Sequence, residues 1–375
     1  MGNAHRIGVV GLGVISRAYL DTLLGHPAVR VTAVADLDAS RSAAVAAELP
    51  GVEALTVEEL LGTPDVDTVL NLTVPAAHAE IALGAIGRGK NVYGEKPLAA
   101  TLVDALAVME AAAKAGVDVG CAPDTVLGTG IQTARGAVEA GSIGRPLFAS
   151  AVMVTPGHER WHPHPDFYYT AGGGPLLDMG PYYLASLVHL LGPVRAVIGA
   201  SSRLRAERVI GSGPRAGERI PVEVDSHVSG VLEHACGALT TITTSFDGVA
   251  TTAAPIEVHG ETGTLTVPDP NGFDGEVRLL ELGDTHWRPL PPSAGYVGGA
   301  RGVGLLDFIA ADGQRAPRAS GDLALHVLET MSALLRSSAE GRRIELTTST
   351  VPPVPVPLTT AQEWRGHAAR RPTSQ

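Results

Sequence analysis

The chain has 375 residues, of which 45% are hydrophobic and 18% are charged, and its formal net charge is −11. This is the composition of a globular protein, and no apolar run reaches the roughly eighteen residues that a membrane-spanning helix needs. The acidic balance argues against nucleic acid as a partner, because phosphate binding relies on clustered Lys and Arg. The length favours two domains, and we expect a small-molecule ligand.

The first residues lead directly into an apolar strand pattern, which leaves no room for a signal peptide. The cysteines, Cys121 and Cys236, are too few and too far apart for a disulfide framework or a thiolate metal site. We therefore expect a cytoplasmic protein that does not associate with membranes.

Up to about residue 122, short apolar runs alternate with helix-period segments, a pattern typical of a parallel sheet covered on both faces. We predict a helix over 101–115, with Thr101 and Asp104 as a capping box and Gly116 as its end. The pattern predicts a doubly wound Rossmann domain over residues 1–122. Its expected strands are 7–11, 31–35, 68–73, 91–93 and 117–121.

From residue 123 onward strand patterns dominate, and they predict a second α/β domain over 123–375 with a large, open-faced, mostly antiparallel sheet. An uncovered sheet face needs a cover, and a second copy of the chain supplies one symmetrically. We therefore expect a homodimer or homotetramer. The expected strands are 147–154, 194–200, 222–232, 239–245, 256–259, 264–267 and 277–282, and the expected helices are 128–140, 303–312 and 320–340.

The segment from Gly11 to Ser16 lies between the first strand and an amphipathic helix, the context of a dinucleotide-binding turn. Gly11 permits the tight turn, Gly13 lets the backbone approach the pyrophosphate, and Ser16 is small enough for close helix packing. The helix N-terminus that follows, with Val14 and Ile15, offers N–H groups to negative charge. The alternative is a glycine turn without a ligand.

Asp36 follows the second predicted strand, where a carboxylate can accept both ribose hydroxyls and repel a 2′-phosphate. This position predicts NAD rather than NADP as cofactor. In the alternative interpretation, Asp36 only ends the strand, and Asp38 caps a helix that begins near Ser40.

Two further segments follow predicted strands and therefore lie at the carboxyl edge of the sheet, where ligands bind. The first contains Thr73, Pro75 and His78, which we predict to contact the cofactor. The second is Glu95-Lys96-Pro97.

Lysine is rare in this chain, since only three of the 28 basic residues are lysines. A lysine kept at the ligand edge, Lys96, indicates a group that can share a proton, which arginine cannot do. We interpret Lys90 and Lys114 as surface lysines.

Together with the glycine turn and the Pro-x-x-His loop, Glu95-Lys96-Pro97 resembles the glucose-fructose oxidoreductase / inositol dehydrogenase / rhizopine catabolism (Gfo/Idh/MocA) oxidoreductase family. Residues 172–180 are similar to its Gly-Gly-Gly…Asp-x-Gly segment, so the resemblance extends over nearly the whole chain. It implies a Rossmann domain followed by an open-faced α/β domain, and NAD(P)-linked oxidation or reduction of a carbinol in sugars and cyclitols. It also implies that Lys96 is catalytic, and we place Glu95 near the nicotinamide ribose.

The chain departs from the family pattern after Gly180, because Tyr182 stands where the family has a proton-transferring histidine. Asp178 and Tyr182 are four residues apart at a helix start, with Pro181 tolerated in the first turn, so both can face one cleft. An ammonium favours the phenolate, so we predict that Lys96 and Tyr182 exchange the carbinol proton while Asp178 orients the substrate. Alternatively, Tyr182 is a core aromatic and Asp178 is the helix N-cap.

The polar and aromatic segment that begins at His158 predicts a substrate-recognition loop. Trp161 is expected to lie against a sugar ring while His158 and His162 bind hydroxyls. Prolines at positions 163 and 165 keep these histidines off a common helical face, so we predict no metal site.

Three further residues are predicted to border the substrate pocket: Asp124, Arg301 and His326. A helix cap at Asp124 and an ordinary surface position for Arg301 are equally compatible with the sequence.

These patterns predict NAD-dependent hydride transfer to or from a secondary carbinol or ketone of a sugar, glycoside or cyclitol. One alternative is redox-neutral glycoside cleavage by transient oxidation and elimination, as some members of the family perform. Another is a non-catalytic regulator that senses NAD or a sugar, against which Lys96 argues.

Overall fold

The computed structural model describes residues 4–311 and 315–366. The described chain divides into two compact units. The first takes the chain up to Gly128, the segment from Tyr296 to Ala324 and the segment from Val356 onward; the second takes Thr129–Gly295 and Leu325–Pro355. No helix in the described ranges combines the length and apolar character needed to cross a membrane.

The first unit contains a six-stranded parallel sheet in the order β3-β2-β1-β4-β5-β6, the Rossmann arrangement that the sequence predicts. Side chains of the central strands, such as Ile7, Val34 and Val69, are fully buried, as expected for a sheet covered on both faces. The two-residue edge strand β3 is exposed and carries no apolar signal, so the sequence did not reveal it. The strands are β1 (His5–Val10), β2 (Val29–Ala35), β3 (Glu53–Ala54), β4 (Thr68–Asn71), β5 (Asn91–Gly94) and β6 (Val119–Cys121).

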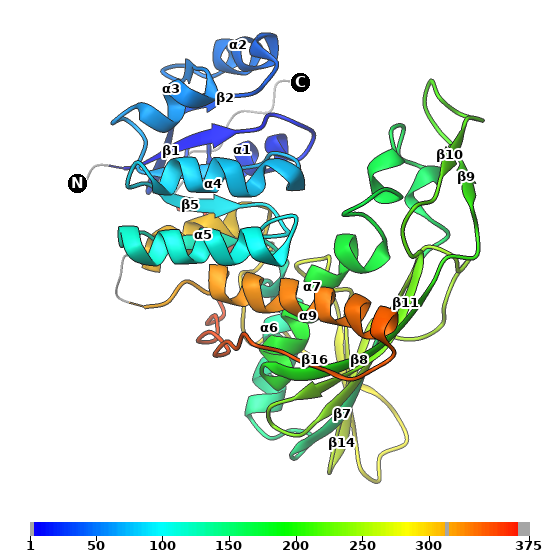
Figure 1. Cartoon of the computed structure of the whole chain (residues 1–375). Coiled ribbons are helices and arrows are strands. Elements are labelled where there is room, and N and C mark those ends of the chain that lie inside the picture. The colour runs from blue at the N-terminus through cyan, green and yellow to red at the C-terminus, as the bar shows by residue number, and fades with distance from the viewer. Residues whose placement is uncertain (1–3, 312–314, 367–375) are drawn as a thin grey trace, which may run out of the picture. The chain divides into compact units, whose positions relative to one another are not determined.

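The helices of this unit follow the strands along the chain, and Figure 1 shows α4 and α5 side by side against the sheet. The predicted ends of α5 are confirmed: Oγ1 of Thr101 accepts from N of Asp104 at 3.1 Å, and Gly116 ends the helix in the left-handed region. Of the predicted capping box the structure gives this N-cap bond, while the Asp104 carboxylate accepts from the Thr101 hydroxyl at 2.7 Å. The helices are α1 (Ser16–Leu23), α2 (Ala39–Glu48), α3 (Val57–Gly62), η1 (Pro75–Ala77), α4 (His78–Ile86), α5 (Leu102–Ala115), η2 (Thr125–Leu127), α8 (Val303–Ala311) and α10 (Ala361–Trp364).

The interpretation of Lys90 as a surface lysine is wrong. Its residue is 6% exposed, and its ammonium donates to the carbonyl oxygens of Thr63 at 2.6 Å and Val66 at 2.8 Å. Lys90 therefore closes the loop between α3 and β4, and burial lowers its pKa.

The second unit contains a nine-stranded sheet in the order β16-β15-β14-β13-β7-β12-β11-β8-β17. Within the described chain all neighbouring pairs are antiparallel except β7 and β12, which confirms the predicted sheet. A separate hairpin, β9 (Glu207–Val209) and β10 (Arg219–Pro221), was not predicted. The sheet strands are β7 (Pro146–Val154), β8 (Val194–Ser202), β11 (His227–His234), β12 (Leu239–Ser245), β13 (Ile256–Gly260), β14 (Gly263–Val267), β15 (Val277–Glu281), β16 (Arg288–Leu290) and β17 (Ile344–Glu345).

Helices cover one face of this sheet (Figure 1). Helix α6 (Thr129–Glu139) contacts β14 and β15, and α7 (Pro175–Leu191) contacts β7, β11 and β12. Helix α9 (Gly321–Glu340) contains residues of both units. Two short helices, η3 (His158–Arg160) and η4 (Asp166–Tyr168), lie in the loop between β7 and α7.

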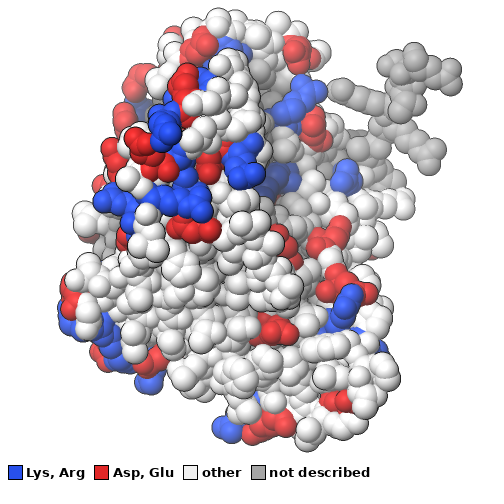
Figure 2. Space-filling model, turned by 90° about the vertical axis from the view of Figure 1, so that its right-hand side faces the viewer, with Lys and Arg blue, Asp and Glu red and all other residues white. Residues whose placement is uncertain are grey.

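The opposite face of the nine-stranded sheet is open. Along one of its rows Thr241 pairs with Val231 and Val231 with Ile198, and Ile198 is 47% exposed. In the next row Leu239 and Phe148 are 47% and 50% exposed. Figure 2, viewed from the side of this sheet, shows mostly uncharged side chains over its lower part. The outer face is therefore a broad, largely uncharged surface.

Candidate active site

The glycine turn follows β1 and leads into α1. Gly11 has a φ of +92°, and a Cβ there would lie 2.6 Å from the carbonyl carbon of Leu72, next to β4. Any side chain at this position would therefore displace the neighbouring backbone. A Cβ on Gly13 would meet no atom within 4 Å, so this part of the turn is open to a ligand.

The start of α1 suits an anion. Its N-cap residue, Ile15, makes no capping side-chain hydrogen bond, and Ser16 turns its hydroxyl back to the carbonyl oxygen of Gly13 at 2.7 Å. Val14 is 99% exposed. Uncapped N–H groups at a helix N-terminus bind phosphate groups, and these residues fit the pyrophosphate of a dinucleotide.

Asp36 is tied to the glycine turn rather than merely ending β2. Its Oδ2 accepts from N of Leu12 at 2.7 Å, and Oδ1 accepts from N of Asp38 at 2.9 Å. Asp38 also caps α2, as the alternative interpretation proposed, by accepting from N of Ser40 at 3.0 Å. The two aspartates therefore have separate roles.

Arg41, which the sequence analysis missed, lies beside Asp36. Its Nη1 is 3.2 Å from Oδ2 of Asp36, and the Arg41 side chain is 48% exposed. Its place in the first turn of α2, shortly after Asp36, is the sequence feature that could have indicated this contact. One carboxylate and one guanidinium therefore lie side by side just after β2.

The side chain of His78 holds the loop after β4 in place. Its ring is buried, with Nδ1 2.6 Å from the carbonyl oxygen of Pro97 and Nε2 3.1 Å from that of Thr73. Burial lowers the pKa of His78, against the opposing effect of the carbonyl oxygens of Pro97 and Thr73. His78 joins two loops of the ligand edge, whereas Thr73 bonds to Asn71 and Pro75 begins η1.

Glu95 and Lys96 follow β5. Oε1 of Glu95 accepts from the hydroxyl of Tyr19 at 2.8 Å, and Oε2 accepts from the backbone N of Lys96 at 3.1 Å. Tyr19 is fully buried, and burial beside Glu95 raises its pKa well above the usual value, so the phenol stays protonated and donates. Tyr19 was not predicted as a residue of the site. Its position on the buried face of α1, three residues after Ser16, is the sequence feature that could have indicated it.

Asp124 and Arg301, predicted separately, form an ion pair. Nη1 of Arg301 lies 3.2 Å from Oδ1 of Asp124, and Oδ2 accepts from the backbone N of Gly302 and Gly304 at 2.8 and 3.3 Å. Asp124 is fully buried and makes no capping bond to η2, and burial raises its pKa against the opposing effect of Arg301. The pair anchors the segment before α8, and of the two only Arg301 is partly exposed, at 17%.

In the second unit, α7 begins at Pro175 with Gly174 as its N-cap. Asp178 therefore lies in the first turn and is not the N-cap, and Pro181 lies inside the helix rather than in its first turn. Tyr182 is buried at 6% exposure, one turn beyond Asp178.

His158 and Asp178 are brought together from different elements. Nε2 of His158 in η3 lies 2.9 Å from Oδ2 of Asp178 in α7. Around the histidine ring stand Tyr168 and Phe246, with ring centroids 4.6 and 4.5 Å away, and Trp161 at 5.3 Å. Both polar residues are predicted from the sequence, but their contact is not.

The exposed part of this loop carries aromatic side chains. Trp161 and Phe167 are 59% and 55% exposed. Nδ1 of His162 accepts from N of His164 at 3.0 Å, and burial lowers the pKa of His162. Across the described ranges, no three His, Cys, Asp or Glu side chains are grouped as a metal site.

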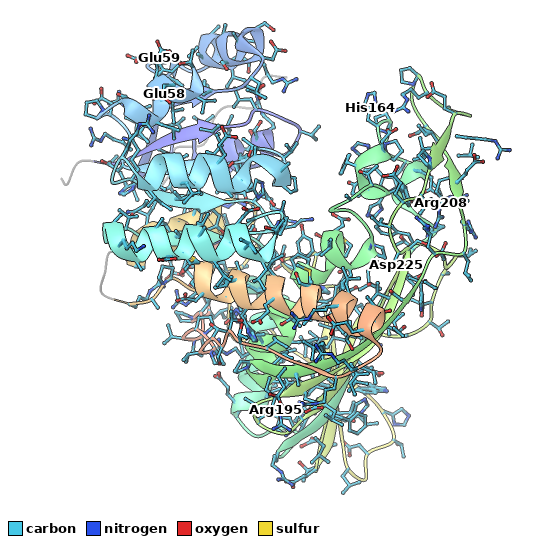
Figure 3. The ribbon with its side chains drawn as sticks, in the orientation of Figure 1. Glu58, Glu59, His164, Arg195, Arg208 and Asp225 are labelled. Carbon is cyan, nitrogen blue, oxygen red and sulfur yellow. The ribbon has the colours of Figure 1, made fainter. Side chains whose placement is uncertain are left out.

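A buried ionic network that the sequence analysis missed lies under the loop. Glu159 is 5% exposed and accepts from the hydroxyl of Tyr169 and, at 3.3 Å, from Nη1 of Arg208. Arg208, labelled in Figure 3, is 3% exposed and also donates to Asp247 at 2.5 Å. No local pattern joins Glu159 to Arg208, because the partners come from distant segments.

His326 lies within the second unit, fully buried. Its Nε2 is 3.0 Å from N of Val194, and Nδ1 is 3.0 Å from Oγ1 of Thr348. The two ring nitrogens thus join α9 to the start of β8 and to the loop that contains Thr348.

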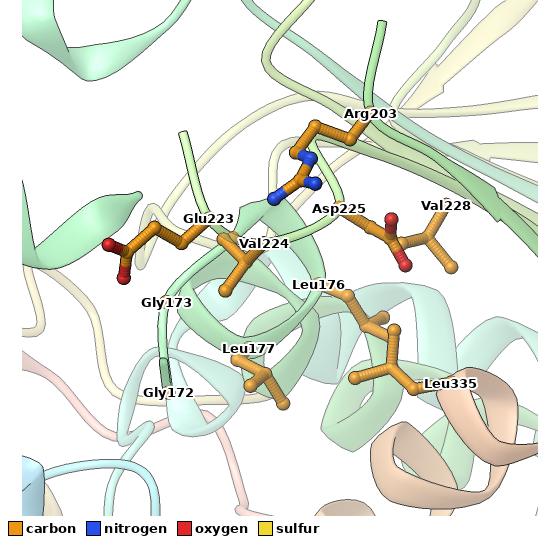
Figure 4. Close-up of a pocket in the computed structure, with 11 residues that line it drawn as sticks. Gly172, Gly173, Leu176, Leu177, Arg203, Glu223, Val224, Asp225, Val228 and Leu335 are labelled. Atoms are coloured by element: carbon orange, nitrogen blue, oxygen red, sulfur yellow. The ribbon is translucent and has the colours of Figure 1, made fainter. Parts of the chain in front are cut away.

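A cavity of about 530 Å³ opens in the second unit beside the first turn of α7. Figure 4 shows Arg203, Glu223 and Asp225 around the apolar side chains of Leu176 and Val224. Leu176 precedes Asp178 by two residues and so lies on a different face of the helix.

Comparisons with known proteins agree with this geometry. The model of an oxidoreductase family with an NAD-binding Rossmann fold (GFO_IDH_MocA) matches residues 5–122, and that of the GFO/IDH/MocA C-terminal domain matches residues 131–266. The chain is 31% identical over 356 residues to 1,5-anhydro-D-fructose reductase of Ensifer adhaerens, covering 92% of this chain and 99% of that protein.

Two further similarities cover most of the chain. Inositol 2-dehydrogenase 3 of Saccharopolyspora erythraea is 31% identical over 281 residues, which is 71% of this chain and 73% of that protein. A solved structure of levoglucosan dehydrogenase in complex with NADH and L-sorbose matches the fold with a TM-score of 0.77 at 21% identity, over 92% of this chain and all of that one. The chain is an NAD-binding oxidoreductase and belongs to the Gfo/Idh/MocA family.

Proposed function

We propose that the chain transfers a hydride between NAD and a secondary carbinol or ketone of a sugar, glycoside or cyclitol. The observation that carries the proposal is the position of Lys96 at the carboxyl edge of the NAD-binding sheet. Its neighbour Glu95 accepts a hydrogen bond from Tyr19 in α1, the helix that follows the glycine turn. The names of the relatives support the substrate class, since they include an anhydrofructose reductase and inositol dehydrogenases.

The residues have distinct roles in this proposal. Bound NAD supplies the hydride acceptor or donor. Lys96 holds and shares the proton of the carbinol oxygen, because an ammonium can give up a proton and arginine cannot. Asp36 holds the ribose hydroxyls, and the N-terminus of α1 holds the pyrophosphate. We assign cofactor binding to residues 1–122, and substrate binding and assembly to residues 123–375.

The test is a panel of sugars, inositols and glycosides, with formation of free NADH followed by absorbance at neutral and alkaline pH. Oxidation of at least one member in the presence of NAD supports the proposal. Cleavage of a glycoside without release of NADH would support redox-neutral elimination instead. Tight NADH binding without turnover of any substrate would favour a sensor.

The exposed ring of Trp161 is proposed to lie against the apolar face of the substrate ring. Trp161→Ala is expected to raise KM about tenfold, equivalent to about 1.4 kcal/mol, with kcat within about twofold, because it removes binding common to ground and transition states. Steady-state kinetics measure both constants, and Trp161→Phe should retain most of the affinity. A large fall in kcat with unchanged KM would contradict this role.

We also propose that the open face of the nine-stranded sheet joins copies of the chain into a homodimer or homotetramer. Thr241→Arg places a charge in the middle of this uncharged surface and is expected to yield monomers in light scattering coupled to gel filtration. Thr252→Arg, in the exposed loop before β13, is the control and should not change the molar mass. An unchanged mass for both variants would place the interface elsewhere.

The cysteines Cys121 and Cys236 are both free thiols, which suits the reducing cytoplasm in which we place the enzyme.

A further inference from the structure

We propose that Tyr19 is a positioning residue for the reaction: through Glu95, its hydroxyl holds the backbone of Lys96 in place at the carboxyl edge of the sheet. This inference rests on the proposed function, in which Lys96 handles the proton of the carbinol oxygen. The groups that carry the inference all belong to the first unit. Tyr19 thereby joins α1, the helix proposed to hold the pyrophosphate, to the residue proposed to handle the proton.

Two hydrogen bonds form the connection. The Tyr19 hydroxyl donates to Oε1 of Glu95 at 2.8 Å, and the backbone N–H of Lys96 donates to Oε2 of the same carboxylate at 3.1 Å. Because the two donors use different oxygens, they fix both the position and the plane of the carboxylate. The Glu95 side chain therefore cannot turn away from Tyr19 without also disturbing its bond to the Lys96 backbone.

The backbone of Glu95 is fixed by the neighbouring strands. Its N–H donates to the carbonyl oxygen of Asn71 in β4 at 2.9 Å, and its carbonyl oxygen accepts from the Cys121 thiol of β6 at 3.6 Å. With the backbone held by the sheet, the direction of the side chain depends on its own partners. Tyr19 supplies the partner that comes from α1, and a group held in this way keeps the geometry that catalysis needs.

The ring of Tyr19 is itself held in place. It is fully buried, and the backbone before α8 packs against it: a Cβ on Gly302 would lie 3.5 Å from Cδ1 of Tyr19 and 3.3 Å from Cβ of Thr22, both on α1. Burial keeps the phenol protonated, and it donates its single O–H proton to Glu95. The hydroxyl therefore has both a fixed position and a fixed direction of donation.

A second buried tyrosine of the same sheet, Tyr93, offers a matched comparison. It lies in β5 two residues before Glu95 and is fully buried like Tyr19, but within the described ranges its hydroxyl makes no hydrogen bond. Removing the Tyr93 hydroxyl therefore breaks no hydrogen bond, whereas removing that of Tyr19 leaves Oε1 of Glu95 without this donor. The two tyrosines thus differ in their bonding to Glu95 and not in their burial.

The decisive variant is Tyr19→Phe, because it keeps the ring and its packing and removes only the donor to Glu95. We expect kcat to fall at least about tenfold, since a small displacement of a catalytic group is costly. The KM of the substrate and the affinity for NADH should stay within about threefold, because their binding contacts are kept. Tyr93→Phe is the control and should keep kcat. A purely structural role would lower the Tm of Tyr19→Phe and leave its kcat unchanged.

Hydrogen exchange of the Lys96 backbone amide provides a readout that does not depend on turnover. This amide is protected by its bond to Glu95, so Tyr19→Phe should speed its exchange at least about fivefold, whereas Tyr93→Phe should not. Mass spectrometry of overlapping peptides measures the rate, with and without NADH. In a Glu95→Ala background the protecting carboxylate is absent, so adding Tyr19→Phe should change the rate less than about twofold.

The outcomes separate the two proposals. If wild type turns over no substrate of the panel but the Lys96 amide exchanges faster in Tyr19→Phe, the proposed function fails, while the hold of Tyr19 on the Lys96 backbone stands. The inference fails if that amide exchanges at the wild-type rate in Tyr19→Phe, or if wild type is active and Tyr19→Phe retains its kcat. An equal loss of kcat in Tyr93→Phe would also overturn it, because packing and not the bond to Glu95 would then be responsible.

Discussion

Replacing Lys96 by methionine is expected to lower kcat about a thousandfold or more while leaving NADH affinity within about twofold. Methionine has a similar length but no proton to share, and it leaves the glycine turn and Asp36 untouched. The hydrogen bond from Tyr19 to Glu95 does not involve the Lys96 side chain, so the loop after β5 should keep its position. Steady-state kinetics and NADH fluorescence titration measure the two quantities.

Two controls sharpen this experiment. Lys96→Arg keeps the positive charge but cannot release a proton at ordinary pH, so it should also be nearly inactive. Lys114→Met removes an exposed lysine paired with Glu110 at 2.6 Å and should retain full activity. Turnover by Lys96→Met within tenfold of wild type would show that the lysine does not handle the proton.

Replacing Asp36 by serine is expected to shift the ratio of kcat/KM for NADP over NAD upward by about 100-fold, or about 2.8 kcal/mol. The change removes the carboxylate that we propose to repel a 2′-phosphate and to bind the ribose hydroxyls. It also releases Arg41, whose guanidinium lies 3.2 Å from Asp36 and is then free to bind the phosphate.

The double variant Asp36→Ser/Arg41→Ala tests the second part of this argument. It should lose the gain for NADP while the loss for NAD persists. Fluorescence titrations with NADH and NADPH give the same comparison without a sugar substrate. A single variant that stays specific for NAD would mean that Asp36 does not set the preference.

Much of the first unit could be predicted because its signals are local. Apolar runs with short spacing specify parallel strands, and Thr101 with Gly116 marks the ends of α5 from neighbouring residues alone. The glycine turn is likewise recognisable from six consecutive residues and their flanking elements. Similar periodicity predicted the large sheet, although β11 begins at His227 rather than at residue 222.

The contacts that define the sites could not be predicted, because their partners are distant in sequence. Asp124 and Arg301 lie 177 positions apart, and Glu159 and Arg208 lie 49 positions apart. Asp178 and His158 were both recognised as polar candidates, but only folding shows that they touch. The residue types in a sequence indicate which side chains could form a site, whereas the strand order and the paths of the loops determine which of them come into contact.

The burial of Lys90 has a practical consequence for chemical labelling. Acylating reagents attack unprotonated amines that they can reach, and Lys90 is enclosed by the backbone carbonyls to which it donates. Among the lysines, coupling to a surface or a dye is therefore directed first to Lys114, which is 74% exposed. In the proposed function, cofactor and substrate cover Lys96, so saturating the protein with both during coupling should favour attachment through Lys114 in α5, a helix remote in sequence from the glycine turn.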